Sequence, residues 1–160
     1  MNNTYRKNVG IVLFNSQGKV LLCERNDQQA NRWQFPQGGV EKDEGYLGAA
    51  LRELYEETGI KSVKLIAQTP QALRYDFPST FKLPFKGQEQ HWFLFYFTGQ
   101  DAEINFTTNP QEIEFKSYQW ADIDIAPKII VEFKKKVYNN IVKFFKPLIR
   151  EYLQGKNYDL

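Results

Sequence analysis

The sequence predicts one domain of mixed α and β structure that spans residues 1–160. Two apolar runs separated by a short turn indicate a β-hairpin near the N-terminus. Residues 44–58 and the chain after Pro127 instead carry apolar residues at the three- and four-residue spacing of amphipathic helices. Because the sequence shows no internal repeat, low-complexity tract or interdomain linker, its 160 residues are expected to form a single core.

The expected strands are short segments rich in apolar, β-branched and aromatic residues. Val9 to Phe14 indicates a buried strand, and the turn at residues 15–18 returns the chain into a second strand over 19–24. Residues 33–39 start extended and end in a turn that glycine makes easily. Further strands are expected at 63–67, 91–98 and 114–120, and loops at 25–31 and 77–87.

Two helices are expected. The first runs over residues 44–58 and ends at Gly59, the usual position of a C-terminal glycine. Its expected apolar positions are Leu47, Ala50, Leu51 and Leu54. The second, long helix begins near Pro127, which suits a first helical turn, and Pro147 should kink or shorten it. Its expected apolar face comprises Ile130, Phe133, Val137, Ile141, Phe144 and Leu148.

Composition excludes several classes of protein. The formal net charge of +2 is too small to argue for nucleic-acid binding by itself. The single cysteine, Cys23, excludes a disulfide framework and a cysteine-cluster metal site, and is expected to be a buried strand thiol. The start of the sequence lacks a signal-peptide segment, and its longest apolar run, residues 92–97, is far shorter than the ~20 residues that span a bilayer. We therefore expect a cytoplasmic protein with no membrane partner.

The segment 38–60 carries the chemistry. Within it, Glu53, Glu56 and Glu57 stand at i, i+3 and i+4, so their carboxylates project from one face of the expected helix. Like charges at this spacing destabilise a helix by about 0.2–0.5 kcal/mol per pair. A hard cation would offset that repulsion, and Mg²⁺ prefers a few carboxylates together with waters and substrate phosphate oxygens. Such an ion can orient a phosphate chain and activate a water for in-line attack on phosphorus.

Three glutamates on one helix face are, taken alone, most often a solvated surface. Here they belong to a longer pattern, Gly-x5-Glu-x7-Arg-Glu-aliphatic-x-Glu-Glu-x-Gly-aliphatic. The matching residues are Gly38, Glu44, Arg52, Glu53, Leu54, Glu56, Glu57, Gly59 and Ile60. With a frequency of ~6% at each fixed position, a chance match in this chain has a probability on the order of 10⁻⁸. Residues 38–60 thus resemble the Nudix box, the motif of hydrolases that cut pyrophosphate linkages in nucleotide-like substrates.

The resemblance implies a fold and a metal site. The fold is an α/β/α sandwich with a mixed β-sheet, in which the box forms a loop–helix–loop. The metal would be divalent, with Mg²⁺ as the first expectation and Mn²⁺ as the alternative. The ligands implied are Gly38, Glu53, Glu56 and Glu57. Glu44 and Arg52 would support the loop–helix geometry, as would Gly59 at the end of the helix.

Outside the box, the chain resembles the bacterial RNA pyrophosphohydrolases, which overlap with the dinucleoside polyphosphate (Ap4A) hydrolases. Members of this group remove pyrophosphate from triphosphorylated RNA 5′ ends, cleave dinucleoside polyphosphates, or do both. The resembling segments are 5–10, 33–39, 87–93, Glu114-Phe115 with Trp120, and 133–138. The most specific of them is Trp-Gln-Phe-Pro-Gln-Gly-Gly at 33–39.

This second resemblance implies roles outside the metal helix. Arg6 and Arg25 would contact phosphate or base. Tyr75 with Phe133 would stack a nucleobase, an interaction worth about 1–3 kcal/mol per base, and packing is the alternative role for both rings. Glu114 would join the three box glutamates as a metal ligand or water-activating carboxylate. The remaining expected substrate-binding residues are Gln37, Gln88 and Lys134.

The chain also departs from this group. Lys7 stands where the group has proline, and Arg32 where it has a small residue. Glu89 replaces an expected lysine, and Gln119 replaces an expected arginine. None of these positions belongs to the metal helix, so they bear on substrate preference and not on the reaction. Glu112 lies two residues before Glu114 and is an alternative for the additional carboxylate.

The sequence leaves the substrate open between the 5′-triphosphate end of RNA and a dinucleoside polyphosphate, with no obligate protein partner indicated. A dinucleoside polyphosphate hydrolase without an RNA role is the main alternative, followed by a sanitising enzyme for modified nucleoside triphosphates. A catalytically silent nucleotide- or RNA-binding module is the alternative from another class of protein. The intact Glu53, Glu56 and Glu57 argue against a silent module, which has no need for a costly carboxylate cluster.

Overall fold

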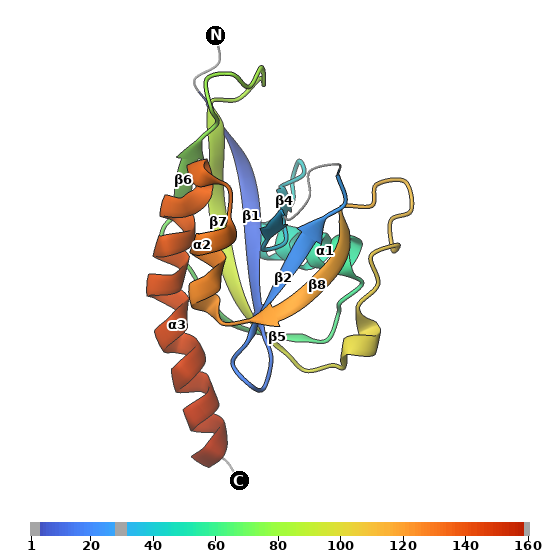
Figure 1. Ribbon diagram of the computed structural model, residues 1–160, viewed down its shortest axis with the longest axis vertical. Helices are drawn as coiled ribbons and strands as arrows, with labels where there is room; N and C mark the ends of the chain where they lie inside the picture. The colour runs from blue at the N-terminus through green and yellow to red at the C-terminus, as the bar shows by residue number, and fades with distance from the viewer. Residues whose placement is uncertain (1–3, 28–31, 159–160) are drawn as a thin grey trace.

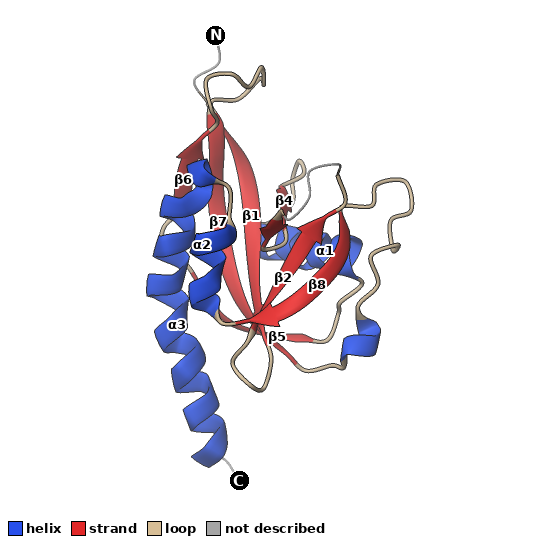
Figure 2. Ribbon diagram, in the orientation of Figure 1, coloured by secondary structure: helices blue, strands red, loops and turns tan. Residues whose placement is uncertain are grey.

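A mixed β-sheet with helices on both faces forms the protein (Figures 1 and 2). The computed structural model describes residues 4–27 and 32–158. Its strands are β1 (Tyr5–Phe14), β2 (Val20–Arg25), β3 (Trp33–Gln34), β4 (Gln37–Gly39), β5 (Val63–Gln68), β6 (Leu73–Asp76), β7 (Gly87–Phe97) and β8 (Phe115–Ala121). Its α-helices are α1 (Tyr46–Thr58), α2 (Ala126–Ile129) and α3 (Lys135–Tyr158). This architecture is the expected α/β/α sandwich.

Strand pairing brings distant parts of the sequence to one end of the sheet. The main path is β3-β2-β1-β7-β5, with β4 beside β1, β6 beside β7, and β8 beside β2. Strands β1 and β7 pair in parallel along the whole of β1, which places Arg6 next to Gln88. Strand β4 pairs with β1 in the antiparallel sense, which places Gly39 next to Asn8. Polar residues from three strands therefore lie side by side.

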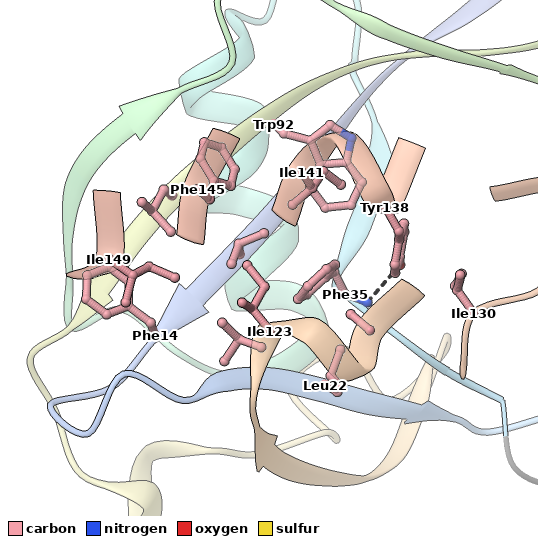
Figure 3. Close-up of a cluster of buried hydrophobic side chains, with 14 of the residues drawn as sticks. Phe14, Leu22, Phe35, Trp92, Ile123, Ile130, Tyr138, Ile141, Phe145 and Ile149 are labelled. Carbon is pink, nitrogen blue, oxygen red and sulfur yellow. Dashed lines mark hydrogen bonds between the residues drawn. The ribbon is translucent and has the colours of Figure 1, made fainter. Parts of the chain in front are cut away.

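The sheet separates two hydrophobic cores, and β1 contributes to both because successive side chains point to opposite faces. Val12 and Phe14 pack in the core that includes Tyr138 of α3, whereas Ile11 and Leu13 pack in the core that includes Leu54 of α1. Figure 3 shows the first of these cores, in which the Phe35 backbone N–H donates a 3.0 Å hydrogen bond to the Tyr138 hydroxyl. Cys23 is fully buried in β2, as expected.

Two strands are longer than expected and two were not expected, because β4 forms at residues 37–39, where a glycine turn was expected. β1 begins at Tyr5 and not at Val9, β7 begins at Gly87 and not at His91, and β6 was absent from the sequence expectation. Arg6 and Asn8 of β1 and Gln88 of β7 are polar and line a cavity, so hydrophobic patterning underestimates the lengths of these strands.

Helix α1 presents a different face to the core than expected. Its buried apolar residues are Ala49, Ala50 and Leu54. Leu47 and Leu51 are 40% and 41% exposed, so their assignment to the core was wrong. Gly59 ends the helix as expected: its φ of 76° is left-handed, and its N–H donates to the Tyr55 carbonyl at 2.8 Å.

The expected second helix is two helices. α2 ends at Ile129, the backbone becomes extended at Ile130, and α3 starts at Lys135. Ile130 and Phe133 therefore precede α3, and Phe144 is 37% exposed, so the expected apolar face was wrong at these positions. The buried residues of α3 are Val137, Tyr138, Ile141, Phe145 and Ile149. The helix continues through Pro147 to Tyr158 and was not shortened there. Among the described residues, neither α3 nor another helix is long and apolar enough to cross a bilayer.

Candidate active site

A polar cavity of about 220 Å³ lies where α1 meets the ends of β1, β4 and β7. The residues that line it are Arg6, Asn8, Gln37, Gly38, Gly39, Glu53, Glu56, Glu57, Gln88, Asn109, Glu112 and Glu114. Eight of the residues expected from the sequence to form the site are in this set. The register of the three strands brings Arg6, Gln37 and Gln88 to its wall, and α1 brings the three box glutamates.

Arg52 holds the start of the box against the helix. Its Nε and Nη2 atoms donate to the two oxygens of Glu44 at 2.7 and 2.9 Å, and Nη2 also donates to the Gly39 carbonyl at 2.9 Å. Its Nη1 atom contacts Glu53 and Glu56 at 2.8 and 3.2 Å. The bidentate contact lowers the pKa of Glu44 to about 2 and raises that of Arg52. Both residues have the geometry of the structural supports that we expected.

The half-buried Glu53 and the buried Glu57 form an acidic pair that lines the cavity. Burial raises the pKa of both carboxyl groups, and at Glu57 the neighbouring Glu53 and Glu114 raise it further, to well above the usual range. The Oε2 atom of Glu57 is buried without a hydrogen-bond partner among the described residues. A side chain at Gly38 would overlap the Glu53 carboxyl group, so only glycine allows the backbone of β4 to approach it.

The loop before β8 brings two further carboxylates to the cavity. Glu112 and Glu114 both line the cavity. Glu114 contributes to the raised pKa of Glu57 and also stabilises the charged form of Lys134, whereas Glu112 is exposed. The geometry therefore favours Glu114 over Glu112 as the residue that acts together with the box glutamates.

Hydrogen-bonded side-chain amides support one wall of the cavity, which Asn8 and Gln37 line. The Gln90 Nε2 atom donates to the Asn8 Oδ1 atom at 2.8 Å and to the Gln37 Oε1 atom at 3.2 Å. Its Oε1 atom accepts a hydrogen bond from the Trp92 indole at 3.1 Å. Asn8, Gln90 and the cavity residue Asn109 were not anticipated from the sequence. For Gln90 the sequence did contain a signal, because Gln88 and Gln90 alternate before an apolar run and so indicate polar residues on one face of a strand.

Aromatic residues and a buried amine lie beside this wall. The rings of Tyr75 and Phe133 contact each other, with centroids 5.6 Å apart, and Tyr75 is only 6% exposed. The Nζ atom of Lys134 lies 5.5 Å from the Tyr75 ring and 5.9 Å from the Phe133 ring. Gln37 and Gln88 neighbour the Tyr75 hydroxyl, which connects this cluster to the cavity.

Arg25 lies outside the main cavity. Its guanidinium pairs with Asp27 at 2.9 Å and lines a second cavity, also of about 220 Å³, together with Arg32 and Trp33. Arg25 and Arg32 of the second cavity lower the pKa of Lys134, and Glu114 of the first cavity raises it. Lys134 therefore lies close to charged residues of both cavities. His91 lies in β7, with its ring packed on Tyr46 at a centroid distance of 3.8 Å.

The donor set fits a hard divalent cation. The cavity presents several carboxylates, and one buried Glu57 oxygen has no protein partner, which suits an oxygen-coordinated ion. In the described part of the chain, no three acidic, imidazole or thiol side chains already converge in a ligating arrangement. Arg52 holds Glu53 and Glu56 by ion pairs, so some carboxylate rotation would accompany metal binding.

Comparison with known protein families identifies the fold and the motif. The model of the NUDIX domain matches residues 4–141, which include the cavity residues and the two helix-supporting side chains. The chain belongs to the Nudix family. Curated Nudix relatives named RNA pyrophosphohydrolase include one from Bartonella quintana, 42% identical over 93% of this chain and 94% of the relative. Another, from Pelagibacter ubique, is 41% identical and covers 93% and 96% of the two chains.

Solved structures agree on the Nudix fold. The dihydroneopterin triphosphate pyrophosphohydrolase of E. coli superposes with a TM-score of 0.67, at 21% identity, covering 89% of this chain and 97% of the other. An Ap4A hydrolase from C. elegans superposes with a TM-score of 0.66, at 19% identity, covering 89% and 98%. At these identities the likeness concerns the fold alone.

Proposed function

We propose that this protein is a metal-dependent pyrophosphohydrolase that removes pyrophosphate from the 5′-triphosphate end of RNA. One observation carries the reaction: Glu53, Glu57 and Glu114 line one polar cavity, and the buried Glu57 Oε2 atom has no hydrogen-bond partner among the described residues. The substrate is supported by relatives more than 40% identical over almost the whole chain that carry the name RNA pyrophosphohydrolase.

Different residues would bind the metal and support its ligands. Glu53, Glu56, Glu57 and Glu114, with the Gly38 carbonyl, would hold Mg²⁺ or Mn²⁺. A bound ion of this kind supplies neutralisation of phosphate charge and a more acidic water nucleophile. Arg52 forms ion pairs with Glu53 and Glu56 on α1 and with Glu44 before it. These contacts hold the carboxylates of α1 in place relative to the start of the box.

Cationic residues at the cavity boundary would position the triphosphate. Arg6 lines the cavity, and its guanidinium occupies the space that a side chain at Gly39 would fill. Lys134 is buried between the aromatic cluster and Glu114. Together with Arg25 these residues would bind the phosphates that leave as pyrophosphate, while Tyr75 and Phe133 would support a nucleobase. Water adds to phosphorus, the anhydride bond breaks, and the products are 5′-monophosphate RNA and pyrophosphate.

Dinucleoside polyphosphates are a second candidate substrate class. The observation that favours them is the second cavity, where Arg25 and Arg32 lie beside the Trp33 indole. Two guanidinium groups and a planar ring suit a nucleoside with its phosphate at the far end of a polyphosphate chain. The two candidates share the same metal site and differ in what occupies this second cavity.

Product analysis tests the proposed reaction. Wild-type protein with Mg²⁺ should convert 5′-triphosphate RNA to 5′-monophosphate RNA with one pyrophosphate per chain, and excess EDTA should abolish the conversion. Release of inorganic phosphate alone, or unchanged turnover in EDTA, would contradict the proposal. An Arg32→Ala variant separates the candidates, because it should weaken hydrolysis of Ap4A more than hydrolysis of RNA if the second cavity holds a nucleoside.

A further inference from the structure

The exposed aromatic surface beside the active site continues onto the loop between β6 and β7. On this loop Phe81 is 47% exposed. Its ring packs edge-on against Phe133 with a centroid distance of 5.7 Å and stacks on Phe77 at 6.0 Å. Tyr75 is almost fully buried and Phe77, Phe85 and Phe133 are half-buried, whereas Phe81 is the exposed ring among these described aromatic residues.

Backbone hydrogen bonds hold the loop that carries Phe81. The Phe77 N–H donates to the Lys86 carbonyl at 2.9 Å and closes the base of the loop. The Phe81 N–H donates to the Pro78 carbonyl, also at 2.9 Å, and closes a turn immediately before the ring. Thr4 accepts a further bond from the Lys86 N–H, which ties the loop to the start of β1. The Phe81 ring is therefore presented at a fixed place next to Phe133.

Positive charge accompanies this aromatic surface. The buried Lys134 lies within 6 Å of the Tyr75 and Phe133 rings, and the loop carries the exposed Lys82 together with Lys86, which pairs with Asp76 at 3.7 Å. Single-stranded nucleic acid is bound by this combination, in which cations follow the phosphates and rings stack on successive bases without hydrogen-bond readout. In order from the cavity outward, the residues are Gln88, Tyr75, Phe133 and Phe81.

We propose that Phe81 stacks a nucleobase downstream of the one supported by Phe133, so that the enzyme favours RNA long enough to reach this ring. The inference rests on the proposed RNA pyrophosphohydrolase function and extends it from the 5′ end to the following nucleotides. Binding energy from a remote base raises the catalytic efficiency only when it helps to position the triphosphate. The signature of Phe81 is therefore a dependence of kcat/KM on the length of the substrate.

A length series tests the assignment. We would measure kcat/KM for 5′-triphosphorylated mono-, di-, tri- and tetranucleotides with the wild-type protein and three variants. Wild-type efficiency should rise with length, and Phe81→Ala should lose about 5- to 150-fold on the longer RNAs, as expected from loss of one stacked base. Phe81→Trp should retain the rise. Leu83→Ala is the matched control, since Leu83 is 51% exposed on the same loop and offers no ring.

The outcomes separate this assignment from the proposed function. If the wild-type protein releases pyrophosphate from none of these RNAs, the proposed function is wrong and the inference falls with it. If it hydrolyses them with a length gain that Phe81→Ala retains, only the role of Phe81 is wrong. An equal loss on the mononucleotide and on the tetranucleotide would also overturn the assignment, because it would make Phe81 a packing support for Phe133.

Discussion

Glu57 is the residue at which burial and charge conflict most strongly in the candidate active site. The residue is 9% exposed, its carboxyl group neighbours two other carboxylates, and its Oε2 atom has no hydrogen-bond partner among the described residues. A buried carboxylate without a countercharge is costly, and the usual responses are protonation or metal binding. A negative charge at Glu57 therefore destabilises the metal-free protein, whereas metal binding and activity require that charge.

Replacement of Glu57 by Gln should separate these demands. The amide keeps the shape of the side chain but removes an anionic oxygen, so turnover with Mg²⁺ should fall by at least ~100-fold. The midpoint of thermal unfolding without metal should be unchanged or higher, because repulsion from Glu53 and Glu114 is relieved. Glu151→Gln, on the exposed surface of α3, is the control. Near-normal turnover of Glu57→Gln would contradict the metal site.

Lys134 should make substrate binding depend on pH. Burial, Arg25 and Arg32 lower its pKa, Glu114 opposes them, and the result is a pKa of about 8. A lowered lysine pKa means that the positive charge is present below that pH and is lost as the pH rises through it. The kcat/KM on 5′-triphosphate RNA should therefore decline above pH 8.

The matched variant is Lys134→Arg, because a guanidinium stays protonated throughout this range. Above pH 8 the ratio of the kcat/KM of this variant to that of the wild-type protein should increase. A ratio that is constant between about pH 6.5 and 9.5 would show that the charge of Lys134 does not control substrate binding.

Among individual residues, the sequence predicts those site residues that belong to one continuous motif. Glu53, Glu56 and Glu57 were identifiable because helix periodicity fixes their common face. Asn8 and Asn109 were not, because they reach the cavity from a strand and a loop whose positions depend on long-range pairing. No local pattern marks such residues.

The helices show why their apolar faces were predicted only in part. In α1 the small Ala49 is buried while Leu47 and Leu51 are exposed, since the box glutamates and the sheet together determine how the helix is rotated. Beyond β8, the break between α2 and α3 shifts the buried positions to Tyr138, Phe145 and their neighbours. Tyr138 has a further reason for burial, because its hydroxyl accepts the Phe35 N–H.

Pro147 is a local weakness of α3. It lies inside the helix, is exposed, and has no N–H to donate to the carbonyl of Lys143. A helix-interior proline costs about 3 kcal/mol relative to alanine, offset in part by the greater freedom of alanine in the unfolded chain. Pro147→Ala should therefore raise the free energy of unfolding by about 1–2 kcal/mol.

Urea unfolding measures this change, with Glu151→Ala on the exposed face of the same helix as the control. Activity should stay at the wild-type value, because Pro147 is not among the residues that line the active-site cavity. An unchanged or lower free energy of unfolding would show that packing of α3 on the sheet already compensates for the missing hydrogen bond.

For the whole molecule, the sandwich could be predicted but the arrangement of its strands could not. The uninterrupted apolar run in β1 indicates burial on both faces, and the box identifies the layer formed by α1. The parallel pairing of β1 with β7 joins segments about 80 residues apart, and hydrophobic pattern alone does not specify that register. The cavity depends on this pairing, because it brings Arg6 and Gln88 together opposite the acidic helix.

The central claim, hydrolysis at the 5′ end of RNA, is tested most directly by one side-by-side measurement with the wild-type protein and Mg²⁺. The kcat/KM is compared for 5′-triphosphate RNA, Ap4A and a free nucleoside triphosphate under identical conditions. The cationic and aromatic residues beside the cavity predict that RNA exceeds the free triphosphate by about 10-fold or more, since one base contact is worth about 1–3 kcal/mol. Equal efficiency on RNA and the free triphosphate, or a wide preference for Ap4A over RNA, would contradict the assignment.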